Sequence, residues 1–175
     1  VLQPSRPSLA DVTDIDNVLD CQALKFTRAP SHELGAGSTG VVYRGTYQDK
    51  NVAIKCIRSA TNSLTNKDNF RRELMLISRL RNPHIVDFVG AAWDDADDTS
   101  NGVDSGPPSL LLVTELMAGG TLRSALSSLP GKPLTCLEVR SFLNVATQIA
   151  RGLVYLHAEG LAHRDIKSAN ILLSH

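Results

Sequence analysis

The hydrophobic pattern of the chain changes near residue 119, and this change limits the folds that the chain can adopt. From about Phe26 to Thr114, short runs of β-branched and aromatic residues are broken by glycine and polar turns. After Gly119-Gly120, apolar residues recur at the three- and four-residue spacing of amphipathic helices. Strands first and helices later predict an α+β fold with two packed lobes.

The pattern before residue 119 predicts four strands and one helix. The clearest strands are 41–43 and 52–54, joined through the turn-rich stretch 48–51, and two more are expected near 86–93 and 110–114. A helix is expected over 66–80, where Phe70, Leu74 and Ile77 keep helical spacing and Pro83 follows. Residues 1–25 fit either a short amphipathic helix or a linker, and we treat them as a linker or N-terminal extension.

Two helices are expected after the glycine pair, over 122–129 and over 135–159. Thr135 is the candidate N-cap of the longer helix. Its apolar residues at helical spacing are Phe142, Ala146, Ile149, Leu153 and Leu156.

Composition excludes several classes of function. Eighteen basic and eighteen acidic side chains cancel, so no net field favours nucleic acid or an anionic membrane as a partner. No apolar run reaches membrane-spanning length, and residues 1–25 lack the basic-then-apolar order of a secretion signal. The three cysteines fit neither a disulfide framework nor a zinc site, which indicates a reducing, cytoplasmic location. The acidic segment 94–102 fits a solvated loop or a docking loop for a basic partner.

A glycine-rich hexad, Gly35-Ala36-Gly37-Ser38-Thr39-Gly40, matches the pattern G-x-G-x-x-G. A dinucleotide-binding turn requires a helix to begin here, and a Walker loop requires Lys and then Ser or Thr after the last glycine. Val41-Val42 follow instead, so the hexad fits a loop between two strands. Glycines let backbone amides approach a polyphosphate closely, although a purely structural hairpin turn is an alternative.

Lys55 lies on a strand with a small neighbour on the same face. Alternation places Ala53 and Lys55 on one face, and Val52 and Ile54 on the other. A small residue beside a lysine suits a flat purine whose phosphates are reached by the ammonium group. A solvent-facing lysine on a half-buried strand is the alternative.

Glu73 borders the apolar face of the helix expected over 66–80. No Lys or Arg lies three or four residues away from it in the sequence. A carboxylate near a core without a local cation is expected to have a tertiary partner, and Lys55 is the candidate. A helix-surface glutamate without a fixed partner is the alternative.

A charged octet, His163-Arg164-Asp165-Ile166-Lys167-Ser168-Ala169-Asn170, follows the long helix. Alone it also fits a surface turn. Together with the glycine loop completed by Val42, the V-A-I-K run ending at Lys55, and Glu73, the octet resembles the eukaryotic-type protein kinase family. The four motifs occur in the order that this family requires, and the resemblance runs from about residue 26 to residue 175.

The resemblance implies a bilobal fold and a reaction. The N-lobe is expected over about 26–114, the hinge over 115–120 and part of the C-lobe over 121–175. The reaction is the transfer of the γ-phosphoryl group of ATP to protein hydroxyls, with Mg²⁺ as cofactor. Lys167 resembles the serine/threonine type, and the runs 82–91 and 119–122 resemble the tyrosine-kinase-like group.

The resemblance also implies the site residues. Asp165 would orient and deprotonate the hydroxyl, Lys167 would lie near the transferring phosphoryl group, and Asn170 would bind Mg²⁺. Thr114 would guard the back of the nucleotide pocket, backbone groups of Glu115 and Met117 would bind adenine, and Leu172 would pack under it. The implied ATP-binding residues are Leu34, Gly35, Ala36, Gly37, Ser38, Thr39, Gly40, Val42, Ala53, Lys55, Glu73, Thr114, Glu115, Met117 and Leu172.

Two residues of the octet have implied roles outside the chemistry. His163 resembles a packing and backbone-bonding residue rather than a proton shuttle. Arg164, next to Asp165, resembles the arginine of kinases that are switched on when a phosphorylated activation loop pairs with it. An upstream activating kinase would then be a partner, besides a protein substrate with a serine or threonine acceptor.

The sequence departs from the family pattern after the octet. The D-F-G aspartate, the activation loop and the A-P-E segment do not occur in the 175 residues. We therefore expect this chain alone to show little or no phosphotransferase activity and to expose the apolar face of the helix over 135–159. A pseudokinase or scaffold that binds nucleotide without turnover is the alternative to an active kinase.

Overall fold

The computed structural model describes residues 17–37, 40–58, 74–94, 109–127 and 136–174. The chain divides into two compact units, and each is described by itself. The first comprises Val1–Leu80 and Asp87–Leu116, and the second comprises Arg81–Val86 and Met117–His175.

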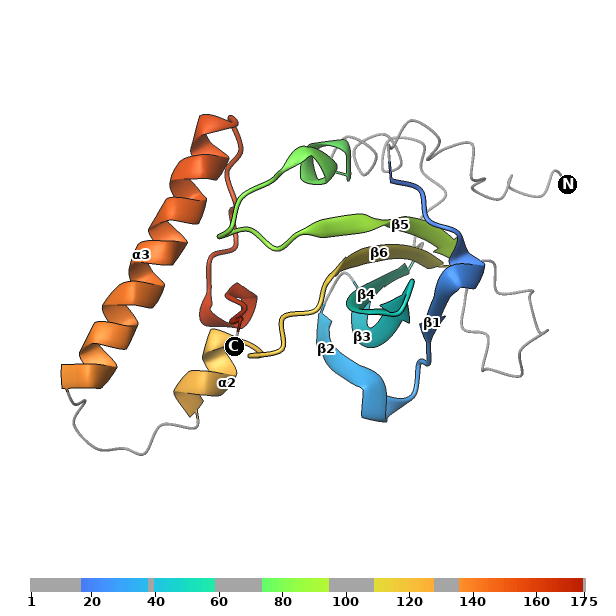
Figure 1. The fold of residues 1–175 in the computed structure, drawn as a ribbon, viewed down its shortest axis with the longest axis horizontal. Helices are drawn as coiled ribbons and strands as arrows, with labels where there is room; N and C mark the ends of the chain where they lie inside the picture. The colour runs from blue at the N-terminus through green and yellow to red at the C-terminus, as the bar shows by residue number, and fades with distance from the viewer. Residues whose placement is uncertain (1–16, 38–39, 59–73, 95–108, 128–135, 175) are drawn as a thin grey trace, which may run out of the picture. The chain divides into compact units, whose positions relative to one another are not determined.

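An antiparallel sheet of six strands forms the first unit (Figure 1). The strands run in the order β1-β3-β4-β6-β5, and β2 also pairs with β3. The four expected strands are confirmed, and β2 is the strand that a glycine loop between two strands requires before it. β1, which starts at Leu24, was not expected because it is too short for its period to be recognised. The strands are β1 (Leu24–Phe26), β2 (Glu33–Gly37), β3 (Gly40–Tyr47), β4 (Lys50–Arg58), β5 (Phe88–Asp94) and β6 (Ser109–Glu115).

A two-residue turn joins β3 to β4. Gln48 and Asp49 have φ angles of 49° and 63°, the left-handed backbone that a tight hairpin needs at both central positions. The expected turn over 48–51 is shorter in the structure because Lys50 and Asn51 pair with residues of β3.

Apolar side chains cover both faces of this sheet. One buried cluster contains Leu24, Val52, Ile54, Cys56, Ala92, Leu111 and Val113. A second contains Leu74, Phe88, Ala91 and Leu110, with Ile77 packed against it. Residues 74–79 are helical, the described end of the helix expected over 66–80, and Leu74 is only 1% exposed. Phe70 lies outside the described residues.

Where the structure describes it, the second unit contains two helices, α2 (Leu122–Ser127) and α3 (Cys136–Ala158), and a short 3-10 turn over Ser168–Asn170. Thr121 caps α2, because its Oγ1 accepts a hydrogen bond from the Ser124 N–H (3.0 Å). Both expected helices are confirmed, although the expected cap Thr135 lies outside the described residues. No helix in the described part of the chain is long and apolar enough to cross a membrane.

The exposed apolar face of α3 differs from the expected one. Leu156 is buried and Phe142, Ile149 and Leu153 are half-buried, so most of the expected face is turned inward. Val139, Leu143 and Val154 are instead 44%, 63% and 69% exposed. These three residues lie beside the expected face, so the apolar stripe of the helix is wider than the five residues that were chosen for it.

Candidate active site

Four of the expected nucleotide-binding residues lie on one face of the first unit's sheet. Val42 pairs with Lys55 across β3 and β4, and Ala53 pairs with Thr114 across β4 and β6. Residues directly opposite each other in an antiparallel pair point to the same face. All four side chains are half-buried, whereas Val52, Ile54 and Cys56 are buried on the other face. The alternation predicted for this strand is confirmed.

The glycine hexad forms a hairpin between β2 and β3, as predicted, with Ser38 and Thr39 outside the described residues. Gly35 pairs with Val42, Ala36 with Val41 and Gly37 with Gly40. Gly40 is required by packing, since its φ is 153° and an added Cβ would overlap the Cys56 carbonyl oxygen. An added Cβ at Gly35 or Gly37 would meet no atom of the described residues within 4 Å, so contacts within that part of the chain do not require a glycine at either position.

Two other residues of the first unit were expected to contribute to the site. Leu34, on β2, is 43% exposed, so its side chain is available to a ligand. Glu73, the expected partner of Lys55, lies outside the described residues. Their ion pair stays a prediction.

Hydrogen bonds at the end of β6 restrict what Glu115 can offer to an adenine. Its N–H donates to the Asp87 carbonyl oxygen (3.0 Å), and its Oε1 accepts from the Asp87 N–H (2.8 Å). The Thr114 hydroxyl donates to the Glu115 carbonyl oxygen (3.3 Å), which keeps a second lone pair. Of the two backbone groups of Glu115, only the carbonyl oxygen therefore remains available to an adenine.

The chain passes into the second unit between Leu116 and Met117, within the stretch expected to be the hinge. The Met117 carbonyl oxygen accepts a hydrogen bond from the Gly120 N–H (3.3 Å). The Met117 N–H has no hydrogen-bond partner among the described residues, so it remains a donor for an adenine ring nitrogen.

A short antiparallel ladder places Leu172 in the second unit. Thr121 forms a bridge with Leu172, the Gly119 N–H donates to the Leu173 carbonyl oxygen (2.9 Å), and the Leu122 N–H donates to the Ile171 carbonyl oxygen (2.8 Å). The Leu172 side chain is 39% exposed. Sequence reasoning missed this ladder, although the Gly119-Gly120 pair was a signal: a Cβ on Gly119 would lie 2.5 Å from the Leu173 carbonyl oxygen.

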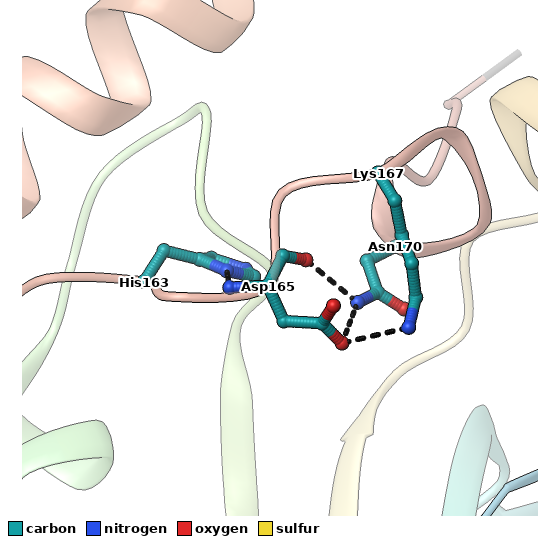
Figure 2. Close-up of polar contacts among 4 residues, drawn as sticks. All are labelled: His163, Asp165, Lys167 and Asn170. Carbon is teal, nitrogen blue, oxygen red and sulfur yellow. Dashed lines mark hydrogen bonds and ion pairs between the residues drawn. The ribbon is translucent and has the colours of Figure 1, made fainter.

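The octet at 163–170 forms a loop in which three of the predicted residues meet, as Figure 2 shows. The Lys167 Nζ lies 2.8 Å from the Asp165 Oδ2. The Asn170 Nδ2 donates to the same Oδ2 (2.8 Å) and to the Asp165 carbonyl oxygen (2.9 Å). The short turn over Ser168–Asn170 brings the amide back to the carboxylate.

The two residues before Asp165 shape the loop. The His163 Nδ1 accepts a hydrogen bond from the Asp165 N–H (3.3 Å), which agrees with the backbone-bonding role expected of it. Its ring is exposed rather than packed. Arg164 has a φ of 62°, an uncommon conformation for a residue with a side chain that often marks functional sites.

Comparison with known proteins identifies the family behind this arrangement. The family model described as "Protein kinase domain" matches residues 29–175. The chain belongs to the protein kinase family. The predicted fold class, with a sheet-rich first unit and a helical second unit, is confirmed with it.

Several curated protein kinases are similar to this kinase chain. It is 39% identical over 145 residues to a probable serine/threonine-protein kinase of Dictyostelium discoideum, covering 82% of this chain and 14% of that protein. It is 33% identical over 147 residues to a serine/threonine/tyrosine-protein kinase of Arabidopsis thaliana, covering 82% and 34%. A serine/threonine-protein kinase of Mus musculus is 36% identical over 154 residues, covering 86% and 17%. The first and third names agree with the serine/threonine type indicated by Lys167, and the second name includes tyrosine as well.

The chain spans only a minor part of each of these relatives, between 14% and 34% of their length. The family of the chain is therefore established. The activity, substrates and partners of the whole protein are treated below as proposals.

The loop geometry of this kinase chain keeps Asp165 ionised. The hydrogen bond from Lys167, and after it the one from Asn170, holds the pKa of the Asp165 carboxyl below the ordinary aspartate value of 3.8. A lowered pKa means that the carboxylate persists from neutral pH into the acid range. Its contacts with Lys167 and Asn170 are lost only as the pH falls through that lowered pKa.

Replacing Asn170 with Ala is expected to raise the Asp165 pKa toward its ordinary value. The substitution removes one of the two side-chain donors that favour the charged form. The titration of the Asp165 carboxyl carbon, followed by NMR, measures the change. Ser127→Ala, on the exposed side of α2, is the control and should leave that titration unchanged. An unchanged Asp165 pKa in Asn170→Ala would contradict the hydrogen bond.

The loop fits one part of a magnesium site. Because the Asn170 Nδ2 points to Asp165, the amide Oδ1 remains available, and an amide oxygen is a suitable ligand for Mg²⁺. Among the described residues, no group of three His, Cys, Asp or Glu side chains is placed to hold a metal. Asn170 would therefore supply one ligand of a site that needs others.

Proposed function

We propose that the protein carrying this chain is an ATP-dependent protein serine/threonine kinase in which Asp165 accepts the proton of the attacking hydroxyl. The observation that carries the proposal is the state of the Asp165 carboxylate. Its Oδ2 forms an ion pair with the Lys167 ammonium group and accepts a hydrogen bond from the Asn170 amide. Its Oδ1 has no hydrogen-bond partner among the described residues. One oxygen is thus fixed by the loop, and the other is available to a substrate hydroxyl.

The proposed step is the direct transfer of the γ-phosphoryl group from ATP to a hydroxyl oxygen. The serine or threonine oxygen attacks the γ-phosphorus, its proton passes to the Asp165 Oδ1, and the bond to the bridging oxygen breaks to release ADP. Because the Asp165 pKa is low, the carboxylate is a weak base and takes the proton late. Its main contribution is then to orient the hydroxyl, which suits a loose phosphoryl-transfer transition state.

Lys167 and Asn170 support this step in different ways. Lys167 is more than half exposed, so its ammonium group can swing from Asp165 to the charge that develops on the transferring phosphoryl group. Asn170 fixes the carboxylate through Nδ2 and offers Oδ1 to Mg²⁺. When bound, the metal ion would neutralise charge on the phosphate oxygens.

The glycine hairpin and Lys55 support the binding of a polyphosphate. Gly35 and Gly37 have open space where a Cβ would stand, which leaves room for a ligand close to their backbone amides. The register places Val42 beside both Gly35 and Lys55. A Lys55 ammonium on the same face as Val42, Ala53 and Thr114 suits a nucleotide whose purine lies on the small and apolar side chains.

The proposed substrates are protein serines and threonines, and the proposed location is the cytoplasm. Arg164 is exposed beside Asp165 in a strained backbone conformation. This exposure supports a role as the receiver of an activating phosphate that an upstream kinase adds.

The acceptor specificity is tested with three peptides that differ only in carrying Ser, Thr or Tyr as the acceptor. The whole protein with Mg²⁺ and ATP labelled in the γ position is expected to phosphorylate the Ser and Thr peptides at rates well above the Tyr peptide. Phosphorylation of the Tyr peptide alone would contradict the serine/threonine assignment.

A further inference from the structure

β5 is the last strand in the described strand order of the sheet. Residues that precede the first strand occupy its outer edge. Val18 forms a parallel bridge with Ala91. The Leu19 N–H donates to the Ala91 carbonyl oxygen (2.8 Å), and the Ala91 N–H donates to the Asn17 carbonyl oxygen (3.0 Å). Residues 17–19, which we call the strap, thus use both backbone groups that Ala91 presents at this edge.

Gly90 makes this close approach possible. The three nearest atoms to an added Cβ all belong to the strap: Leu19 Cδ2 and Cγ, both at 2.5 Å, and the Asn17 carbonyl oxygen at 2.6 Å. Gly90 does not have a positive φ, so its backbone conformation is open to any residue. A glycine is therefore needed at this position because the strap lies so close, and not because of the backbone conformation of the residue.

The strap inserts one side chain into each of the two cores of the first unit. Leu19 packs against the cluster that includes Val52, Ile54 and Leu111. Val18 packs against the cluster formed by Leu74, Phe88, Ala91 and Leu110. Leu74 belongs to the helix over 74–79, so the strap and this helix share one core.

We propose that the strap is an interaction element that holds the helix over 74–79 in place through this shared core. It couples the segment before the first strand to the helix, and Gly90 is the residue that admits it. It lies at a sheet edge, where local opening costs less than global unfolding. Any event that pulls residues 17–19 off β5 is then transmitted to the helix.

Gly90→Ala is expected to displace the strap, because the added methyl group and the strap cannot occupy the same space. Hydrogen exchange at the Leu19 and Ala91 amides should rise at least about tenfold, together with exchange in the helix over 74–79. Exchange in the hairpin of β3 and β4 reports whether the rest of the sheet stays folded. Lys25→Ala, an exposed change on β1, is the control and should leave all these amides unchanged.

Leu19→Ala is the second variant, chosen in case the glycine substitution unfolds the whole unit. It keeps the two backbone hydrogen bonds but removes the side chain from its core. Exchange at Leu19 and Ala91 should rise less than in Gly90→Ala, while the β3–β4 hairpin stays protected. Unchanged exchange at these two amides in both folded variants would overturn the strap. Faster exchange at the Leu19 and Ala91 amides with unchanged exchange in the helix over 74–79 would contradict the proposed coupling between the strap and the helix.

The consequence for activity rests on the proposed function. Glu73 directly precedes Leu74 in the chain, so a loosened helix is expected to lower phosphotransfer by the whole protein by up to about 10²-fold, as a misplaced site residue does. Exchange does not depend on turnover. A protein without kinase activity would therefore contradict the proposed function and leave the exchange test of the strap intact.

Discussion

Asp165→Asn is expected to lower the rate of phosphoryl transfer by the whole protein about 10²–10⁴-fold, the range for loss of a positioned acid or base. The amide keeps the size of the carboxylate and an oxygen that Lys167 and Asn170 can contact. It cannot take up the proton of the hydroxyl. The turnover number at saturating Mg²⁺, ATP and peptide measures the loss.

The folded structure should be unaffected by this substitution, because the Asp165 side chain is 61% exposed. Binding of Mg²⁺ and ATP, followed as a shift of the unfolding temperature, is expected to persist. Asp49→Asn, an exposed aspartate in the β3–β4 turn, is the control and should keep full activity. A turnover number for Asp165→Asn within a few-fold of the parent protein would rule out Asp165 as the proton acceptor.

Lys55→Met is expected to reduce phosphoryl transfer by about 10²-fold or more, because it removes a charged donor from the phosphates. Methionine keeps an unbranched stem at a half-buried position, so the free energy of unfolding should change by less than about 1.5 kcal/mol. The affinity for Mg²⁺ and ATP and the turnover number are measured together with the midpoint of denaturant unfolding.

Lys50→Met is the matched control, since Lys50 lies on the same strand with an exposed side chain. It is expected to retain the activity of the parent protein. Full activity in Lys55→Met would contradict both the phosphate contact and the predicted ion pair with Glu73. If Lys55→Met unfolded while Lys50→Met stayed folded, Lys55 would serve the core of the sheet instead.

The sequence predicted the strands and helices in which apolar residues recur at a regular spacing over several residues. β4 is an example, since Val52, Ile54 and Cys56 are buried and Ala53 and Lys55 lie on the other face. The strap could not be predicted, because residues 17–19 meet β5 across more than seventy positions and have no local period. α3 shows the same limit, since the packing decides which part of its wide apolar stripe is buried.

In the candidate site, the residue identities could be predicted from the sequence, whereas their contacts could not. The identities of Asp165, Lys167 and Asn170 followed from the octet, whereas their hydrogen bonds depend on the turn over Ser168–Asn170. The glycine pattern alone made Gly35, Gly37 and Gly40 equivalent. The structure separates them, because only Gly40 is pressed against the Cys56 carbonyl group. Which backbone group of Glu115 stays available depends on Asp87, a residue to which the sequence assigned no role in the site.

The most direct test of the proposed function measures nucleotide binding and phosphoryl transfer on one preparation of the whole protein. With Mg²⁺ and γ-labelled ATP, we expect saturable binding together with label on serine or threonine hydroxyls of an added protein substrate. Label should disappear in Asp165→Asn while binding remains. Binding of ATP without any label on protein in the parent sample would contradict the proposed function and indicate a nucleotide-binding scaffold.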